Sequence, residues 1–219
     1  MGARRYDMQA RTRAVEAARA RAVQAAYELL LEPKCHELGL DAVARRAGVT
    51  RVTLYNHFGS RSLLLLELFQ ELGRRMGAER IYAAMRLADP LEAMTAMIRE
   101  STRGSWREQQ AVRKLFAFSV LDEELHREVE RAERARRRSL LHLAERLSAA
   151  QKLVLGSRDA AALLAELTSF QAFEALAFDS GARHVEERLQ HLARAGLGIS
   201  ETKGGKSESI GRRRIGRRG

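Results

Sequence analysis

The chain has 219 residues and is strongly basic, with 39 Lys and Arg against 28 Asp and Glu and a net charge of +11. Its 45% hydrophobic residues suffice for one or two globular domains with a real core, which excludes an overall disordered or fibrous chain. The longest stretch without Asp, Glu, Lys or Arg is nine residues, Val52–Ser60, far short of the roughly 18 to 20 apolar residues of a membrane span. No uninterrupted apolar segment near the N-terminus indicates a secretory signal. We therefore expect a cytoplasmic protein without a membrane partner.

The positive charge is concentrated at the two ends of the chain. Residues 1–62 and 198–219 each carry a net charge of +5, whereas residues 63–197 carry +1. Two basic ends on a nearly neutral body are typical of a protein that binds a polyanion, and nucleic acid is the leading candidate. An Arg-rich genome is the alternative explanation of the composition, so a motif has to decide between the two.

The spacing of apolar residues predicts an all-α fold of about nine helices, without a strand pattern or an internal repeat. Pro33 ends the first helix, Gly48 ends the second, and Thr50 and Ser60 are placed to cap the third and fourth. The expected helices span residues 12–31, 41–47, 50–58, 61–77, 90–102 and 106–118, a long segment opened by Asp122, and then residues 157–178 and 183–195.

Two of these expected helices are apolar on more than one side. The helix at 61–77 is rich in leucine around much of its circumference, which predicts that it joins two cores. The helix at 157–178 has leucine and phenylalanine on most sides, so it must be covered on two of them.

Ala44, Gly48 and Leu54 have the spacing of a helix-turn-helix. A small residue at Ala44 lets two helices approach closely, and Gly48 supplies the left-handed backbone of a tight turn. The inner core is expected to contain Val43, Ala47, Val49, Leu54 and Phe58. The outward face is expected to contain Arg45, Arg46, Arg51, Thr53, Tyr55, Asn56 and His57. Side chains of these types can read base edges in the major groove and hold phosphates, and the helix N-terminus at Thr50 can bind a phosphate as well.

The residues around this spacing make the motif more specific. The segment Ala47–Arg61, AGVTRVTLYNHFGSR, and the Leu63-Leu64 pair after it resemble the DNA-binding signature of the TetR family of bacterial transcriptional regulators, including its Leu-Tyr-x-His-Phe core. The resemblance implies an N-terminal three-helix DNA-binding domain on a larger helical domain. It implies phosphate contacts at Thr50, Thr53, Tyr55 and His57 and at Arg61, which takes the place of a usual lysine, and base contacts at Arg51, Val52 and Asn56.

Three features depart from the family pattern. Val52 stands where a glycine is often found, and Gly39 stands where a common threonine caps the second helix and holds a phosphate. The stretch Glu32–His36 differs from the usual short turn with an aromatic residue. These departures concern the target sequence and the docking angle rather than the presence of the module.

TetR-like proteins dimerise through their larger domain, which often binds a small effector. The resemblance therefore implies a homodimer on a palindromic operator of double-stranded DNA. The dimer interface is expected on the last two long helices, at Leu163, Leu167, Phe173, Leu189 and Leu192. An effector of unknown identity, apolar or aromatic, is expected beside Tyr82, Met85, Met97, Trp106, Phe116 and Phe170, with simple core packing as the alternative for each.

No residue pattern supports catalysis or a cofactor. The chain has no Gly-rich phosphate loop, no Gly-x-Ser-x-Gly elbow and no His-Glu-x-x-His motif, so we expect no enzyme. Its one cysteine, Cys35, excludes an internal disulfide, and the Cys35-His36 pair lacks the four-ligand spacing of a structural zinc site. An inert thiol and a redox sensor remain the alternatives for Cys35.

The sequence thus predicts three regions: a basic arm and DNA-binding domain at 1–62, a dimerisation and effector domain at 63–197, and a basic disordered tail at 198–219. The arm, with Arg4, Arg5, Arg11 and Arg13, is expected to follow the DNA backbone or to enter the minor groove. We expect a homodimeric repressor that a small molecule releases from its operator. The alternative is a nucleoid- or RNA-associated protein that binds polyanions without sequence preference through its basic ends.

Overall fold

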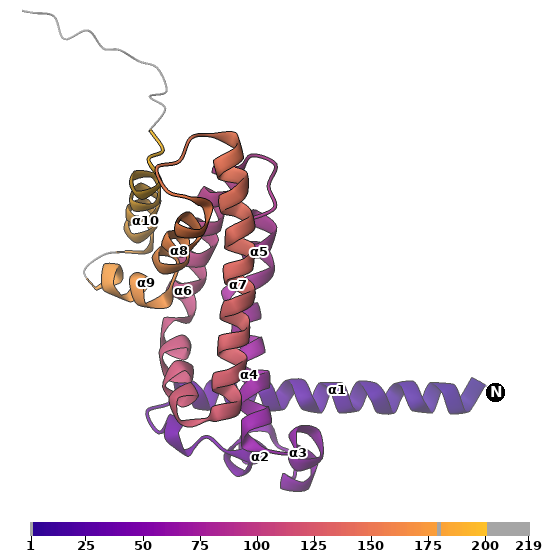
Figure 1. Cartoon of the computed structure of the whole chain (residues 1–219). Coiled ribbons are helices and arrows are strands. Elements are labelled where there is room, and N and C mark those ends of the chain that lie inside the picture. The colour runs from indigo at the N-terminus through magenta and orange to yellow at the C-terminus, as the bar shows by residue number, and fades with distance from the viewer. Residues whose placement is uncertain (1, 179–180, 201–219) are drawn as a thin grey trace, which may run out of the picture.

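The computed structural model describes residues 2–178 and 181–200, with side chains from residue 13 onward, and every regular element in this part of the chain is a helix (Figure 1). The prediction of an all-α fold is confirmed. The N-terminal module comprises α1 (Gly2–Leu31), the 3-10 helix η1 (Cys35–Glu37), α2 (Leu40–Ala47) and α3 (Arg51–Phe58). The body comprises α4 (Arg61–Met76), α5 (Ala78–Ala84), α6 (Pro90–Leu121), α7 (Glu123–Ala150), α8 (Ser157–Leu167), α9 (Phe170–Ala177) and α10 (Ala182–Leu197).

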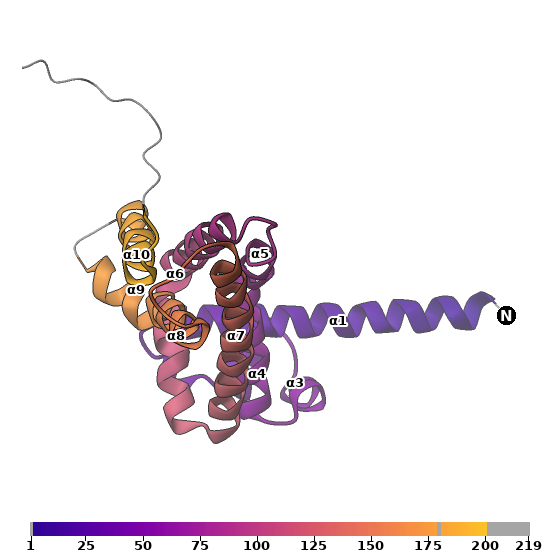
Figure 2. The same cartoon turned by 45° about the horizontal axis from the view of Figure 1, so that its top comes forward.

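The helices form an elongated body with the N-terminal module at one end (Figures 1 and 2). The long helices α6 and α7 run along the body, α8, α9 and α10 pack beside them, and α2 and α3 lie near the start of α4. The first part of α1 projects away from the rest of the chain in both views. None of the helices within residues 2–178 and 181–200 combines the length and the apolarity that crossing a membrane requires.

The projecting part of α1 corrects the expected start of the first helix. We expected a helix from residue 12 with a basic arm before it, but α1 already begins at Gly2. A helix with side chains is about 10 to 12 Å wide, whereas the minor groove of B-DNA is about 6 Å wide. An arm in this helical conformation therefore does not fit the minor groove, which leaves contact with the DNA backbone.

The predicted helix starts in the middle of the chain are set by side-chain caps. The Thr50 hydroxyl accepts a hydrogen bond from the Thr53 amide at 3.1 Å, and the Ser60 hydroxyl accepts one from the Leu63 amide at 3.1 Å. Asp122 caps α7 in the same way, through the amide of Leu125. Each cap satisfies a backbone N–H group that has no partner within its helix.

Two helix boundaries in the body differ from the prediction. Residues 90–121 form one continuous helix, α6, where we expected two, and the expected helix at 157–178 is divided into α8 and α9. The division follows from local hydrogen bonds, since the Thr168 hydroxyl donates to the carbonyl of Leu164 and the Ser169 hydroxyl accepts from the amide of Ala172. The seven-residue helix α5 was not predicted.

Gly104 explains why α6 does not end where the sequence indicated. A Cβ atom at this position would lie 2.3 Å from the carbonyl oxygen of Met76, at the end of α4. The absence of a side chain therefore lets two helices touch through their backbones. In this place glycine serves close helix packing rather than helix termination.

The buried residues form two clusters, and α6 contributes to both. Its first half places Met94, Met97 and Ile98 in the core of the body, and its second half places Leu115 and Phe118 in the core of the N-terminal module. The buried leucines of α4 all belong to the N-terminal core. The helix α7 also reaches both cores, with Leu125 in the N-terminal core and Leu140 and Leu147 in the body core. The two cores are therefore joined by α6 and α7, and the prediction that the helix at 61–77 joins them was wrong.

The folded body also extends beyond the boundary expected at residue 197. Ile199 is 7% exposed, belongs to the body core, and donates its backbone N–H to the carbonyl of Arg194. The rest of the expected disordered tail, residues 201–219, lies outside the described residues.

Replacement of Gly104 by alanine is expected to destabilise the protein by about 1–3 kcal/mol, because the new methyl group overlaps the backbone of α4. The matched control is Gly73→Ala within α4, where a Cβ meets nothing within 4 Å, so the change is expected to stabilise by roughly 0.5–1 kcal/mol. Urea unfolding of the two variants measures both values. Equal stability of the two variants would show that the contact of α6 with α4 is not tight.

Candidate DNA-binding surface and ligand cavity

The turn between α2 and α3 has the geometry that the sequence predicted. Gly48 has a φ of 67°, in the left-handed region that glycine adopts without strain. Beside it, Ala44 is 5% exposed, and Leu54 on α3 is fully buried. The whole predicted inner core packs together, with Val43, Leu54 and Phe58 buried and Ala47 and Val49 partly buried against them.

This packing leaves one side of α3 open to solvent. Val52 is 68% exposed and Tyr55 is 59% exposed, although both side chains are largely apolar. Arg51 and Asn56 are exposed on the same helix, while Thr53 and His57 are half-buried. The exposed face therefore combines a cation, an amide, a phenol and a methyl-bearing side chain, as needed for contacts to base edges and phosphates.

Three candidate residues on this surface have partners within the chain. The Nε atom of Arg51 lies 3.1 Å from a carboxylate oxygen of Asp41, in an ion pair whose two side chains are more than half exposed. Such exposed pairs contribute little energy, so DNA can replace this contact. The hydroxyl oxygens of Thr50 and Thr53 lie 2.8 Å apart, which fixes the first turn of α3.

Arg61 occupies a different environment from the other candidates. Its Nε donates to the carbonyl oxygen of Leu38 at 2.7 Å, and its guanidinium lies 5.0 Å from the centre of the Phe118 ring. Arg61 therefore joins the segment before α2 to the end of α6. These contacts position Arg61 within the module, and its phosphate contact stays a prediction.

Further polar contacts fasten the N-terminal module to α6. The ammonium group of Lys114 donates to the carbonyls of Leu31 and Glu32, both at 2.8 Å, at the C-terminal end of α1. The Tyr27 hydroxyl donates to the carboxylate of Glu108 at 2.6 Å, and Glu108 is only 5% exposed. Burial and the neighbouring carboxylate both raise the pKa of Tyr27. The partners are 81 to 83 residues apart in the sequence, and sequence reasoning missed these contacts because no local pattern links them.

A cavity of about 530 Å³ lies among helices α4 to α9 of the body. Five of the six predicted effector contacts line it, namely Tyr82, Met85, Met97, Phe116 and Phe170. Trp106 does not line the cavity, because its ring packs edge-on against Phe173 at 6.2 Å between centres. Most of the remaining lining residues come from α4, α6 and α7, and they include apolar side chains as well as polar and charged ones.

The charged residues of the cavity are paired with one another. Arg136 forms two hydrogen bonds to the carboxylate of Glu133, at 2.8 and 3.0 Å, and Arg137 contacts both Glu133 and Glu166. Arg136 also donates to the hydroxyl of Thr168. Burial tends to raise the pKa of Glu133, but the hydrogen bonds and positive charges of Arg136 and Arg137 outweigh it and hold this pKa below its ordinary value.

The predicted dimer contacts fall into two groups. Phe173 and Leu189 are each 2% exposed and belong to the core of the single chain, so they have no surface to offer a partner. Leu192 is 43% exposed, and Leu163 and Leu167 are half-buried. Only these three residues remain candidates for an interface.

No group of three or more His, Cys, Asp and Glu side chains within the described residues is arranged to hold a metal ion. Cys35 is a half-buried free thiol in η1.

The ion pairs of Glu133 predict a pH-dependent stability. A carboxylate with a lowered pKa stabilises the folded state above its ordinary pKa, near 4.5, and loses this contribution as the pH falls further. Glu133→Gln is therefore expected to lower the thermal unfolding midpoint at pH 7, with a difference from the unmodified chain that narrows as the pH drops below about 4.5.

Thermal unfolding followed by circular dichroism between pH 3.5 and 8 measures this difference. The control is Glu145→Gln on the same helix, where the carboxylate has a histidine 3.9 Å away in place of two arginines. If the difference in unfolding midpoint between Glu133→Gln and the unmodified chain were the same over the whole pH range, the charge of Glu133 would not be its cause.

Comparison with known proteins agrees with this arrangement. Residues 22–68 match the family described as bacterial regulatory proteins, tetR family. The HTH-type transcriptional regulator BetI of Agrobacterium fabrum is 30% identical over 98 residues, which are 45% of this chain and 44% of that protein. The match thus spans less than half the length of this relative.

Solved structures match over most of the chain. A transcriptional regulator of the TetR/AcrR family from Thermobifida fusca superimposes with a TM-score of 0.65 and 23% identity, over 81% of this chain and 97% of the other. NalD, the secondary repressor of the MexAB-OprM multidrug efflux pump in Pseudomonas aeruginosa, gives a TM-score of 0.61 and 26% identity, over 83% of this chain and 96% of its own. With its helix-turn-helix, its matching signature and its all-helical body, the chain carries a DNA-binding domain of the tetR family of bacterial regulatory proteins at residues 22–68 and has the fold of solved TetR-family regulators.

Proposed function

We propose that the protein is a homodimeric repressor that acts in the cytoplasm and that a small molecule releases from a palindromic operator. The main support is the exposed face of α3 on a module whose core is shared with α6. The same helix α6 lines the large cavity through Met97, Val112 and Phe116. A ligand in the cavity therefore touches the helix that holds the DNA-binding module.

The exposed face of α3 is proposed to enter the major groove. Arg51 and Asn56 have the hydrogen-bonding groups to read base edges, and the methyl groups of Val52 suit a thymine methyl. Phosphate contacts are assigned to the polar residues around them, which are Arg45, Thr50, Thr53, Tyr55 and His57. Phosphate contacts position the module, whereas base contacts select the sequence.

Replacement of Asn56 by alanine is expected to weaken binding to the operator by about 1–3 kcal/mol and to relax base preference at one position of each half-site. Tyr55→Phe is the matched comparison, because loss of a phosphate contact weakens all DNA about equally. Titration of operator and random duplexes at fixed salt measures both effects. Equal losses on the two duplexes for Asn56→Ala would remove Asn56 from the base-reading residues.

Dimerisation is proposed through α8 and α10. These helices lie on one side of the body (Figure 1), and they carry the three candidates that keep exposed surface, Leu163, Leu167 and Leu192. A two-fold dimer places two copies of α3 on successive turns of the same DNA face, so the operator has to be a palindrome.

Selection of random duplex DNA by the purified protein at about 0.15 M salt is expected to enrich a palindrome. A chain ending at Ser200 is expected to enrich the same sequence, because all residues of the two described cores lie before that point. Retention of DNA without enrichment, lost when residues 201–219 are removed, would instead support sequence-independent polyanion binding.

In the same selection, Leu192→Glu is expected to enrich a single half-site instead of a palindrome, because a carboxylate at the interface opposes dimerisation. The control is Leu121→Glu, at a side chain that is 87% exposed at the end of α6 and far from α10 (Figure 1). Sedimentation of both variants gives their oligomeric states. If Leu192→Glu is still a dimer and Leu121→Glu is a monomer, the interface lies elsewhere.

The cavity is proposed to bind an uncharged, largely apolar effector. Its lining is mostly apolar, and the carboxylates of Glu133 and Glu166 are already paired with Arg136 and Arg137. An ionised ligand would therefore be buried without a free partner of opposite charge, which is costly. The effector releases DNA only if it binds the form with mismatched recognition helices more tightly than the DNA-bound form.

A neutral aromatic probe, 2-naphthalenemethanol, is expected to release operator DNA from the unmodified protein. Ser101→Leu, which places a larger, branched side chain in the wall of the cavity, is expected to weaken this release at least tenfold. Fluorescence anisotropy of labelled operator measures the release, and Arg127→Gln, which removes an exposed arginine of α7 outside the cavity, serves as the control. Release that is equal in the unmodified chain and in Ser101→Leu would contradict binding in this cavity.

A further inference from the structure

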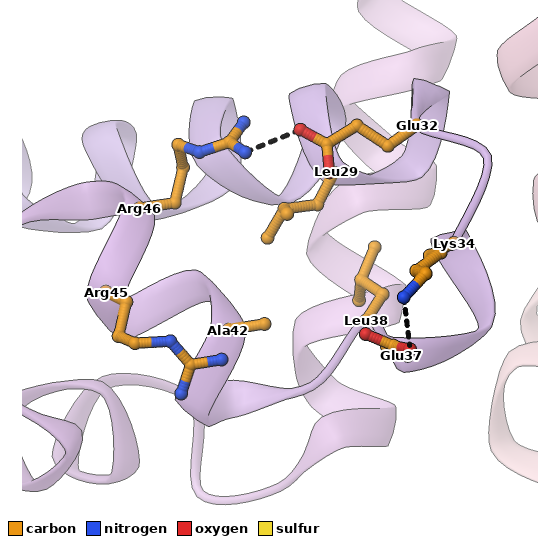
Figure 3. A pocket seen from close by; sticks show the side chains of 8 residues that line it. All are labelled: Leu29, Glu32, Lys34, Glu37, Leu38, Ala42, Arg45 and Arg46. Carbon is orange, nitrogen blue, oxygen red and sulfur yellow. Dashed lines mark hydrogen bonds and ion pairs between the residues drawn. The ribbon is translucent and has the colours of Figure 1, made fainter.

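A second cavity lies in the DNA-binding module itself (Figure 3). It has a volume of about 360 Å³ and lies where the end of α1, the 3-10 helix η1 and α2 meet. We call it the α1–α2 cavity. Its lining residues are Leu29, Glu32, Lys34, Glu37, Leu38, Ala42, Arg45 and Arg46. It shares none of them with the larger cavity of the body.

Three apolar side chains line the α1–α2 cavity, beside the charged residues. Leu29 comes from α1, Leu38 from the segment after η1, and Ala42 from α2, and these three side chains face one another across the hollow (Figure 3). Leu38 is only 2% exposed and belongs to the core of the module. A ring or a short alkyl chain placed here would cover apolar surface that is otherwise in contact with water.

The charged residues around these side chains leave one positive charge without a partner. Arg46 forms ion pairs with Glu32 and Glu28, and Lys34 lies 3.8 Å from the carboxylate of Glu37. Both carboxylates that line the cavity are thus paired. Arg45 is exposed and has no ion pair or hydrogen bond with any described residue of the chain. Its guanidinium lies beside Ala42, one of the three apolar side chains (Figure 3).

We propose that the α1–α2 cavity binds a small carboxylate that carries an apolar ring or chain. The apolar part lies against Leu29, Leu38 and Ala42, and the carboxylate pairs with the guanidinium of Arg45. A planar guanidinium suits a carboxylate, because it offers two parallel N–H groups to the two oxygens. A neutral ligand of the same shape lacks this pair and binds more weakly.

The site also has a regulatory consequence, which rests on the proposed function. Arg45 is among the residues assigned to DNA phosphates, so one guanidinium would serve two anions. A carboxylate bound at Arg45 therefore competes directly with the DNA backbone. This competition needs no change in the spacing of the recognition helices, unlike release through the cavity of the body.

The test measures binding of 2-naphthoate and of its neutral counterpart, 2-naphthalenemethanol, to the full-length protein by isothermal titration calorimetry. Arg45→Gln removes the charge, and Ala42→Leu fills the interior. Each is expected to weaken naphthoate binding at least tenfold. Two controls are expected to leave it unchanged: Ser101→Leu in the body cavity, and Arg127→Gln, which removes an exposed arginine of α7.

The possible outcomes separate this site from the one in the body. Naphthoate binding that is lost in Arg45→Gln and kept in Ser101→Leu supports the proposal, even if neither probe releases DNA and the proposed function fails. Naphthoate binding that is lost only in Ser101→Leu overturns it. The proposal is also overturned if naphthoate does not bind at concentrations on the order of 10 mM, or if it binds equally to all variants. Arg45→Gln changes an exposed side chain and is expected to fold. It therefore tests the proposal even if Ala42→Leu fails to fold.

Discussion

The second half of α6 is the part of the structure on which the DNA-binding module and the large cavity both depend. Phe118 is buried in the core of the module and Phe116 lines the cavity, while Val112 and Leu115 belong to both. Lys114 lies between them and binds the last carbonyls of α1. Because these side chains leave one rigid helix in different directions, a ligand that displaces α6 at the cavity displaces the support of α1 in the same movement.

The two cavities differ in charge, and this difference separates the ligands proposed for them. In the body, Glu133 and Glu166 are matched by Arg136 and Arg137, so no free charge remains for a ligand. In the DNA-binding module, the carboxylates are matched and Arg45 is left over. On the proposals made above, neutral and anionic compounds act on this protein by different routes, one through helix movement and the other through competition for a phosphate contact.

The local features of the module were predictable from the sequence because each depends on residues a few positions apart. Thr50 caps α3 through Thr53, and Gly48 adopts the left-handed turn that its spacing indicated. In the body, local signals were misleading. The sequence predicted a break between residues 102 and 106, but Gly104 lies inside one continuous helix, where the backbone of Met76 at the end of α4 leaves no room for a side chain. The apolar pattern of 157–178 gave no sign that Ser169 starts a new helix.

By itself, the sequence determined the all-helical class, the helix-turn-helix and the set of residues on the outward face of α3, since periodicity, capping and turn chemistry are local. Only the tertiary structure decided how these residues are used. It engages Arg61 with Leu38 and Phe118, and it gives Arg45 no ion pair or hydrogen bond with the described residues, although both are arginines of the same module. It buries Phe173 and leaves Leu192 exposed. The physical reason is that each of these outcomes depends on partners from other helices, which a pattern along one helix does not contain.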